Sequence, residues 1–145
     1  MFELKTILLV DDNPQDVELT IEALKENNLS NHVVAVGDGV EAMEYLNYEG
    51  KFKNRVKSNP IVMLLDIKMP RMDGIEVLEA IRKNEKLKTI PIVMLTSSRE
   101  EPDLKKCYAL GVNAYVVKPV NFQDFMVAVK QIGIFWAMLN ELPLE

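Results

Sequence analysis

The most constraining feature of the sequence is the run of residues 61–65, five apolar side chains followed at once by the carboxylate of Asp66. A strand without polar positions is typical of a parallel sheet that is covered on both faces. In open α/β sheets, ligands bind outside the carboxyl ends of the strands, where the strand order reverses. Asp66 is therefore predicted to stand at the functional edge of such a sheet.

Other short apolar runs have the same character and alternate with segments of helical periodicity. The predicted strands are residues 5–10, 32–36, 61–65, 92–95 and 114–117. The predicted helices begin near Asn13, Asp38, Gly74, Leu104 and Asn121, and residues 48–59 are predicted to form a long surface loop. Five strands alternating with five helices predict an α/β fold, in which right-handed crossovers cover both sides of one parallel sheet.

Composition favours a single soluble domain. The chain has 145 residues, of which 48% are hydrophobic and 27% charged, with a formal net charge of −5. This acidic excess argues against nucleic acid or an anionic membrane as a partner. No apolar stretch approaches the roughly 20 residues that span a bilayer, and no signal peptide is recognised. The single cysteine, Cys107, permits no internal disulfide and fits a cytoplasmic location, with core packing as its expected role.

Polar side chains of chemical use follow four of the predicted strands: Asp11 and Asp12, Asp66, Thr96 and Lys118. In a parallel sheet these ends share one edge. Three converging carboxylates would raise one another's pKa unless a cation neutralised them, and Mg²⁺ prefers such oxygen ligands. A carboxylate nucleophile, a magnesium ion, a lysine and a hydroxyl are the groups needed to form an aspartyl phosphate.

Each residue also has an ordinary structural explanation when taken alone. Asp11 or Asp12 could simply form a turn or cap a helix, and Asp73 is better explained in that way. Thr96 alone would suggest a cap, and Lys118 alone a solvated strand end. Their convergence at one sheet edge is what favours the phosphoryl-transfer interpretation.

These motifs resemble the receiver domain of two-component response regulators. The resemblance rests on the pair Asp11 and Asp12, on Asp66 followed by MPRMDG (residues 69–74), on Thr96, and on Lys118 with its following proline. It covers nearly the whole chain in the family's order. It implies a flavodoxin-like, doubly wound, five-stranded parallel sheet in the order 2-1-3-4-5 with five helices.

The resemblance also implies a metal and phosphoryl site. Asp66 would take a phosphoryl group from a phosphohistidine on a partner sensor histidine kinase. Asp12 and Asp66 would bind Mg²⁺ directly with the backbone carbonyl of Lys68, while Asp11 would act mostly through water. Lys118 would pair with the phosphoryl group.

The same resemblance implies a switch. Thr96 would move toward the phosphoryl group, and Tyr115, at the position of the family's switch aromatic, would turn inward. The expected output is a change in protein contacts at the face of the fourth helix, fifth strand and fifth helix. The bond between Lys118 and Pro119 is often cis in such domains.

The loop of residues 48–59 and the tail of residues 132–145 resemble stand-alone regulators that work with phytochrome-type kinases. A receiver domain is expected over residues 1–133 and a C-terminal helical extension over 134–145. Apolar residues on more than one face of this extension predict a homodimer interface, and these are Phe135, Trp136, Met138, Leu139 and Leu142. The alternative is a tail that folds back over its own domain.

Two other functional classes share part of this pattern. A phosphatase or phosphotransferase enzyme also works through an aspartyl phosphate, but such enzymes usually carry a second acid two residues after the nucleophile, where this chain has Lys68. A flavodoxin-like cofactor binder would need a phosphate-binding loop after the first strand, where this chain has Asp11 and Asp12. The sequence therefore favours a phosphoacceptor signalling protein over an enzyme.

Overall fold

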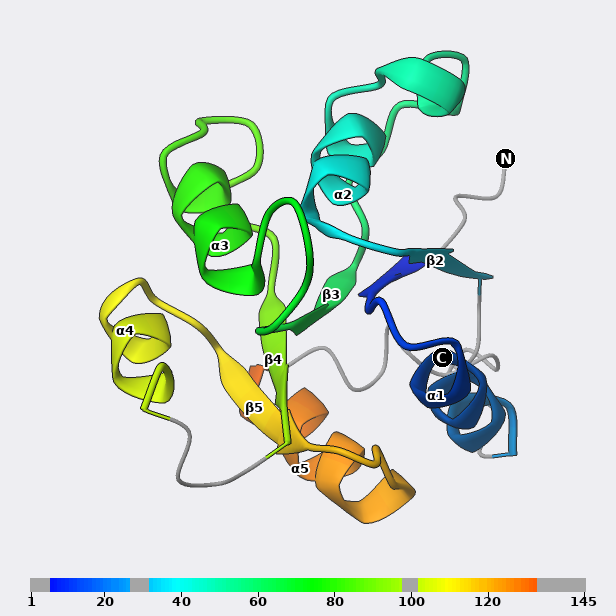
Figure 1. Ribbon diagram of the computed structural model, residues 1–145, viewed down its shortest axis with the longest axis vertical. Coiled ribbons are helices and arrows are strands. Elements are labelled where there is room, and N and C mark those ends of the chain that lie inside the picture. The colour runs from blue at the N-terminus through cyan, green and yellow to red at the C-terminus, as the bar shows by residue number, and fades with distance from the viewer. Residues whose placement is uncertain (1–5, 27–31, 98–101, 133–145) are drawn as a thin grey trace, which may run out of the picture.

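A computed structural model describes residues 6–26, 32–97 and 102–132 (Figure 1). Within these residues, one parallel sheet has the order β2-β1-β3-β4-β5. Its strands are β1 (Thr6–Val10), β2 (His32–Val36), β3 (Val62–Asp66), β4 (Ile92–Thr96) and β5 (Ala114–Val117). The α-helices of the same residues are α1 (Pro14–Glu26), α2 (Gly39–Leu46), α3 (Gly74–Arg82), α4 (Leu104–Ala109) and α5 (Phe122–Ile132). The predicted flavodoxin-like architecture is confirmed.

Helices cover both faces of the sheet. Helices α1 and α5 lie on one face, and α2, α3 and α4 lie on the other (Figure 1). Alternate residues of β1 supply the two cores: Leu8 packs with the α2, α3 and α4 side, and Leu9 with the α1 and α5 side. Burial on both faces explains why β1, β3 and β4 have no polar interruption.

Side-chain caps fix where α1, α2 and α3 begin. Asn13 and Asp38 accept backbone N–H groups at the starts of α1 and α2. At α3, Asp73 accepts the backbone N–H of Glu76, and the Glu76 side chain accepts the backbone N–H of Asp73. This capping box confirms that Asp73 starts a helix.

Two strands run one residue further than their apolar runs. Asp66 still pairs with Leu95, and Thr96 with Val117. Strand pairing uses backbone groups, so it can continue past the point where side chains become polar. The ends of β3 and β4 therefore hold the two polar side chains in the rigid sheet.

The predicted surface loop before β3 contains a short 3₁₀ turn, η1 (Gly50–Phe52). The Arg55 guanidinium lies 3.8 Å from the ring centre of Tyr45 and 4.2 Å from that of Tyr48. Arg55 also donates to the backbone carbonyls of Tyr45, Val56 and Ser58. The loop is thus anchored to the end of α2.

Three further expectations concern one peptide bond, membrane-spanning helices and the C-terminal extension. The peptide bond between Lys118 and Pro119 is cis, as the resemblance suggested. Among the residues that the structure describes, no helix has the length and apolar character needed to cross a membrane. The predicted extension of residues 134–145 lies outside the described residues.

Candidate functional site

Three carboxylates meet at the carboxyl edge of the sheet. Asp11 and Asp12 follow β1, Asp66 ends β3, and their oxygens lie within 4.8 Å of one another. Asp11 and Asp66 are buried, whereas Asp12 is exposed. Carboxylate oxygens at this spacing fit a small hard cation such as Mg²⁺, because its preferred ligands are carboxylate and carbonyl oxygens. The predicted convergence of strand ends is therefore present.

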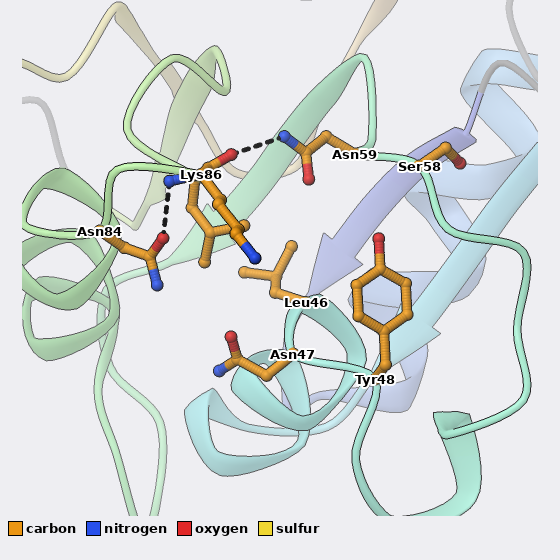
Figure 2. Close-up of a pocket in the computed structure, with 8 residues that line it drawn as sticks. Leu46, Asn47, Tyr48, Ser58, Asn59, Asn84 and Lys86 are labelled. Carbon is orange, nitrogen blue, oxygen red and sulfur yellow. Dashed lines mark hydrogen bonds between the residues drawn. The ribbon is translucent and has the colours of Figure 1, made fainter.

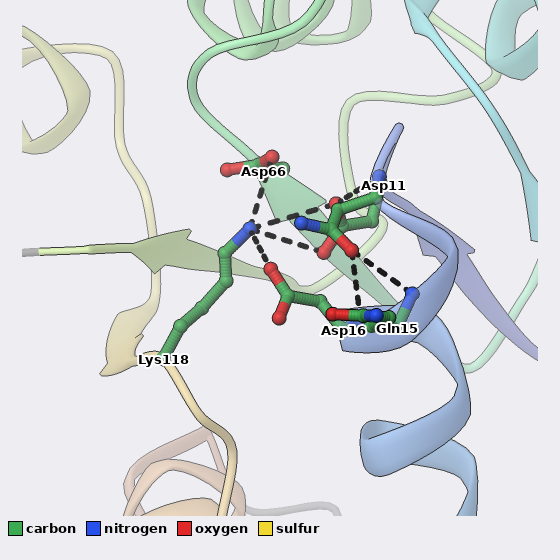
Figure 3. Close-up of polar contacts among 6 residues, drawn as sticks. Asp11, Gln15, Asp16, Asp66 and Lys118 are labelled. Atoms are coloured by element: carbon green, nitrogen blue, oxygen red, sulfur yellow. Dashed lines mark hydrogen bonds and ion pairs between the residues drawn. The ribbon is translucent and has the colours of Figure 1, made fainter.

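Lys118 follows β5, and its ammonium lies among carboxylates (Figure 3). Its Nζ is 3.2 Å from Asp11 Oδ2, 3.2 Å from Asp66 Oδ2 and 3.0 Å from Asp16 Oδ2. Only 15% of the Lys118 side chain is exposed, so these contacts are shielded from bulk water. One lysine thus connects the ends of β1, β3 and β5 with helix α1.

A hollow of about 210 Å³ opens beside these groups. It is lined by Asp12, Asn13, Asp66, Ile67, Lys68, Thr96, Ser97 and Lys118. Thr96 is buried at the end of β4, and its carbonyl accepts the backbone N–H of Lys118 at 2.8 Å. A carboxylate, a hydroxyl and an ammonium therefore face one space, which is large enough for a phosphoryl group.

Tyr115 lies apart from the residues that line this hollow. It is partly buried on β5, and its ring meets the ring of Tyr108 edge-on at 6.1 Å. Tyr108 belongs to α4, so the predicted switch aromatic contacts the helix that follows β4 rather than Asp66.

Burial and neighbouring charges alter the acid–base behaviour of the site. The pKa of Asp66 is raised to about 6, mainly by burial; the charge of Lys118 opposes this rise, and the charge of Asp11 adds to it. Burial lowers the pKa of Lys118, but the hydrogen bond with Asp16 and the charges of Asp66 and Asp11 outweigh this and raise it. Lys118 therefore stays charged, and a cation near Asp66 would favour the ionised carboxylate.

Sequence reasoning did not identify Asp16 as part of the site. In the sequence it is an ordinary acidic residue in the first turn of a helix, a position that the helix dipole favours. The position of Asp16, three residues after the Asn13 cap, did carry a signal. The cap fixes where α1 begins, and the start of the helix decides which first-turn residues face the strand ends.

The loop after Asp66 is held by a second group that the sequence did not reveal. Arg71 has a left-handed backbone (φ 63°) and donates two hydrogen bonds to Asp38, at 2.7 and 3.1 Å. The backbone N–H of Gly39 donates to the carbonyl of Met72 at 3.1 Å. These contacts join the loop to the start of α2.

Lys68, in the same loop, forms an ion pair with Asp103 at 3.2 Å, next to α4. The Lys68 side chain is 72% exposed, so we assign little stability to this pair. Its ammonium extends from the loop toward α4, beside the hollow that Lys68 lines.

A second hollow lies at the opposite edge of the sheet, where loops lead into β3 and β4 (Figure 2). It has a volume of about 400 Å³ and is lined by Leu46, Asn47, Tyr48, Ser58, Asn59, Asn84, Lys86 and Leu87. The Asn59 amide donates to the Lys86 carbonyl, and the Lys86 backbone N–H donates to Asn84 Oδ1. Of the predicted site residues that the structure describes, none lines this hollow.

Comparison with known proteins identifies the family. Residues 7–130 match the response regulator receiver domain. Response regulator Rcp1 of Synechocystis sp. is 39% identical over 139 residues, which cover 96% of this chain and 93% of the relative.

Solved structures agree with this match. The bacteriophytochrome response regulator AtBRR is 54% identical with a TM-score of 0.89, covering 97% of this chain and 100% of that one. The Mn²⁺-bound form of Rcp1 is 38% identical with a TM-score of 0.74, covering 97% and 99%. The chain is thus related to phytochrome response regulators, and it belongs to the response regulator receiver domain family.

Proposed function

We propose that this protein is a signalling switch in which Asp66 accepts a phosphoryl group from a phosphohistidine of a sensor histidine kinase. The observation that carries the proposal is the buried Asp66 carboxylate at the carboxyl edge of the sheet, 3.2 Å from the Lys118 ammonium. The Asp66 carboxylate is thus positioned to attack phosphorus, and the Lys118 ammonium is positioned to bind the transferred group.

The transfer would form a bond between an Asp66 oxygen and phosphorus and break the bond between phosphorus and the histidine nitrogen of the kinase. Asp11, Asp12 and Asp66, with the backbone carbonyl of Lys68, would hold Mg²⁺. When bound, the ion would neutralise charge on the phosphoryl oxygens. Lys118 would bind one of these oxygens, since its ammonium already lies at Asp66. The domain would thus promote only its own phosphorylation and dephosphorylation.

The signal would then pass from the site to the surface. The buried hydroxyl residue Thr96 would move toward the phosphoryl group, and Tyr115 would change its contact with Tyr108 of α4. A population shift between two states requires only that the phosphoryl group favours one of them. The output would be a protein contact at the face of α4, β5 and α5.

The proposal includes a phytochrome-type kinase as the partner, because similar proteins are named bacteriophytochrome response regulators. It also includes a cytoplasmic location, which the single cysteine fits.

The homodimer is proposed from Phe135, Trp136, Met138, Leu139 and Leu142, which lie outside the described residues. Sedimentation of Trp136→Glu beside the unaltered protein tests it: a monomeric variant of a dimeric protein is expected, and equal masses would contradict it.

The deciding experiment is intact-protein mass spectrometry after incubation with acetyl phosphate and Mg²⁺. One added phosphoryl group is expected in the unaltered protein and none in Asp66→Asn. Asp73→Asn is the matched control, because it removes a carboxylate from the following loop while asparagine can still cap α3. It should be labelled normally. Equal labelling of Asp66→Asn would remove Asp66 from its proposed role.

A further inference from the structure

Lys118 has a carboxylate partner on α1, in addition to the two that come from strand ends. The distance between Lys118 Nζ and Asp16 Oδ2 is 3.0 Å, shorter than the distances to Asp11 and Asp66. An ammonium has three N–H donors, and three carboxylates surround this one.

Local structure fixes the place of Asp16. Asp11 Oδ1 accepts the backbone N–H of Asn13 at 3.0 Å, and Asn13 Oδ1 accepts the N–H groups of Gln15 at 2.9 Å and Asp16 at 3.2 Å. The start of α1 is therefore tied to the acidic cluster, as Figure 3 shows. With α1 held in this way, the Asp16 carboxylate reaches Lys118 from the helix side.

The carboxylates that could share one cation are Asp11, Asp12 and Asp66; Asp16 is not in that group among the described residues. A divalent ion bound there would repel the ammonium of Lys118 and offset the attraction of the carboxylates that it occupies. Asp16 lies outside the ion's ligand group, so its attraction for Lys118 would persist.

We infer that Asp16 is a positioning residue, which holds Lys118 beside Asp66 while a divalent cation occupies Asp11, Asp12 and Asp66. This inference rests on the proposed function and deepens it. Without Asp16, Lys118 relies only on carboxylates that the cation also needs. The ammonium and the cation then compete, and the cation binds more weakly.

The test is calorimetry of Mg²⁺ binding to the unphosphorylated protein. Asp16→Asn is expected to raise the Mg²⁺ dissociation constant roughly fivefold to tenfold, the scale of one partly buried charged hydrogen bond. Glu18→Gln is the matched control, because it removes the same charge from an exposed position of α1 and should change the constant by less than about twofold. Asp16→Ser replaces Asp16→Asn if that variant does not fold.

A double-mutant cycle shows whether Asp16 acts through Lys118. In a Lys118→Gln background, Asp16→Asn should change the dissociation constant by no more than about twofold. An unreduced effect in that background, or equal effects of Asp16→Asn and Glu18→Gln, would overturn the inference. Neither result depends on phosphorylation, so failure of Asp66 labelling by acetyl phosphate would separately overturn the proposed function.

Discussion

The two edges of the sheet carry hollows of different size and chemistry. At the amino edge, the hollow of about 400 Å³ is lined by three asparagines, one lysine and uncharged side chains, and none of the described lining residues is a carboxylate. At the carboxyl edge, the hollow of about 210 Å³ is lined by Asp12, Asp66 and Lys118. The smaller hollow is the better candidate site, because burial of opposite charges, not volume, marks groups prepared for chemistry.

The difference follows from the direction of the strands. Loops that leave parallel strands gather at the carboxyl edge, where they bring Asp11 and Lys118 to Asp66. Loops that enter the strands gather at the other edge. There Asn59 and Asn84 already use side-chain atoms in hydrogen bonds with the backbone of Lys86. The amino edge therefore stabilises connections, and the carboxyl edge holds charges close together.

The greatest change in the free energy of unfolding is predicted from a pair of glycines, one near each edge of the sheet. A methyl group on Gly74 would overlap the carbonyl oxygen of Asp66 and lie 3.0 Å from Ile67 Cα, and backbone atoms cannot rotate away. Gly74→Ala should lower the free energy of unfolding by about 4 kcal/mol. Gly50 lies in the loop that borders the larger hollow and has a φ of 57°. A methyl group there would meet the Glu44 side chain, so Gly50→Ala should lower the free energy of unfolding by about 1 to 2 kcal/mol. Urea unfolding measures both, and equal losses would contradict the comparison.

Each of the two hollows is lined by a lysine that can be removed. Lys118→Ala removes the cation from the acidic hollow and should slow phosphorylation by acetyl phosphate roughly a hundredfold, because charge on the transferred group is no longer stabilised. Lys86→Ala removes the lysine of the other hollow and should leave the rate unchanged. Rates come from timed mass spectra. A comparable loss in Lys86→Ala would show that the amino edge takes part in the reaction.

The raised pKa of Asp66, about 6, predicts a pH dependence of stability in metal-free protein. Burial penalises the charged form of Asp66 in the folded state, so protonation of Asp66 stabilises the fold. This stabilisation is complete below the unfolded pKa near 4 and is lost as pH rises through about 6. Relative to Asp66→Asn, the unaltered protein should gain about 2 kcal/mol between pH 7 and pH 4. Urea unfolding in the presence of a chelator measures this gain in the free energy of unfolding. The Asn84→Ala variant, altered at the other edge, should show the same gain. Equal pH dependence of Asp66→Asn would refute the explanation.

The smallest effect concerns the loop of the larger hollow. Arg55→Lys keeps the charge but loses the planar group that lies against Tyr45 and Tyr48 and donates to backbone carbonyls. It should lower the free energy of unfolding by about 1 kcal/mol and leave the phosphorylation rate unchanged. Thermal unfolding and timed mass spectra test the two parts. A slower phosphorylation would connect the two edges.

Much of the site was predictable because strand ends are visible in the sequence. Asp66 and Thr96 each follow an apolar run, and parallel strands bring such ends together. The role of Arg71 was not predictable, since a left-handed arginine has no sequence signature and its partner Asp38 lies at the start of α2, distant in the sequence. Asp16 was missed because first-turn acidic residues are common whether or not they face a site.

The alternation of strands and helices, the helix starts and the polar strand ends can all be read from the sequence. These depend on the polarity of neighbouring side chains and on caps that act over a few residues. The set of carboxylates that share the ammonium of Lys118 depends instead on how the folded elements meet. Asp16 and Lys118 lie near opposite ends of the domain sequence, and their 3.0 Å contact exists because α1 and the end of β5 meet at one edge of the folded sheet.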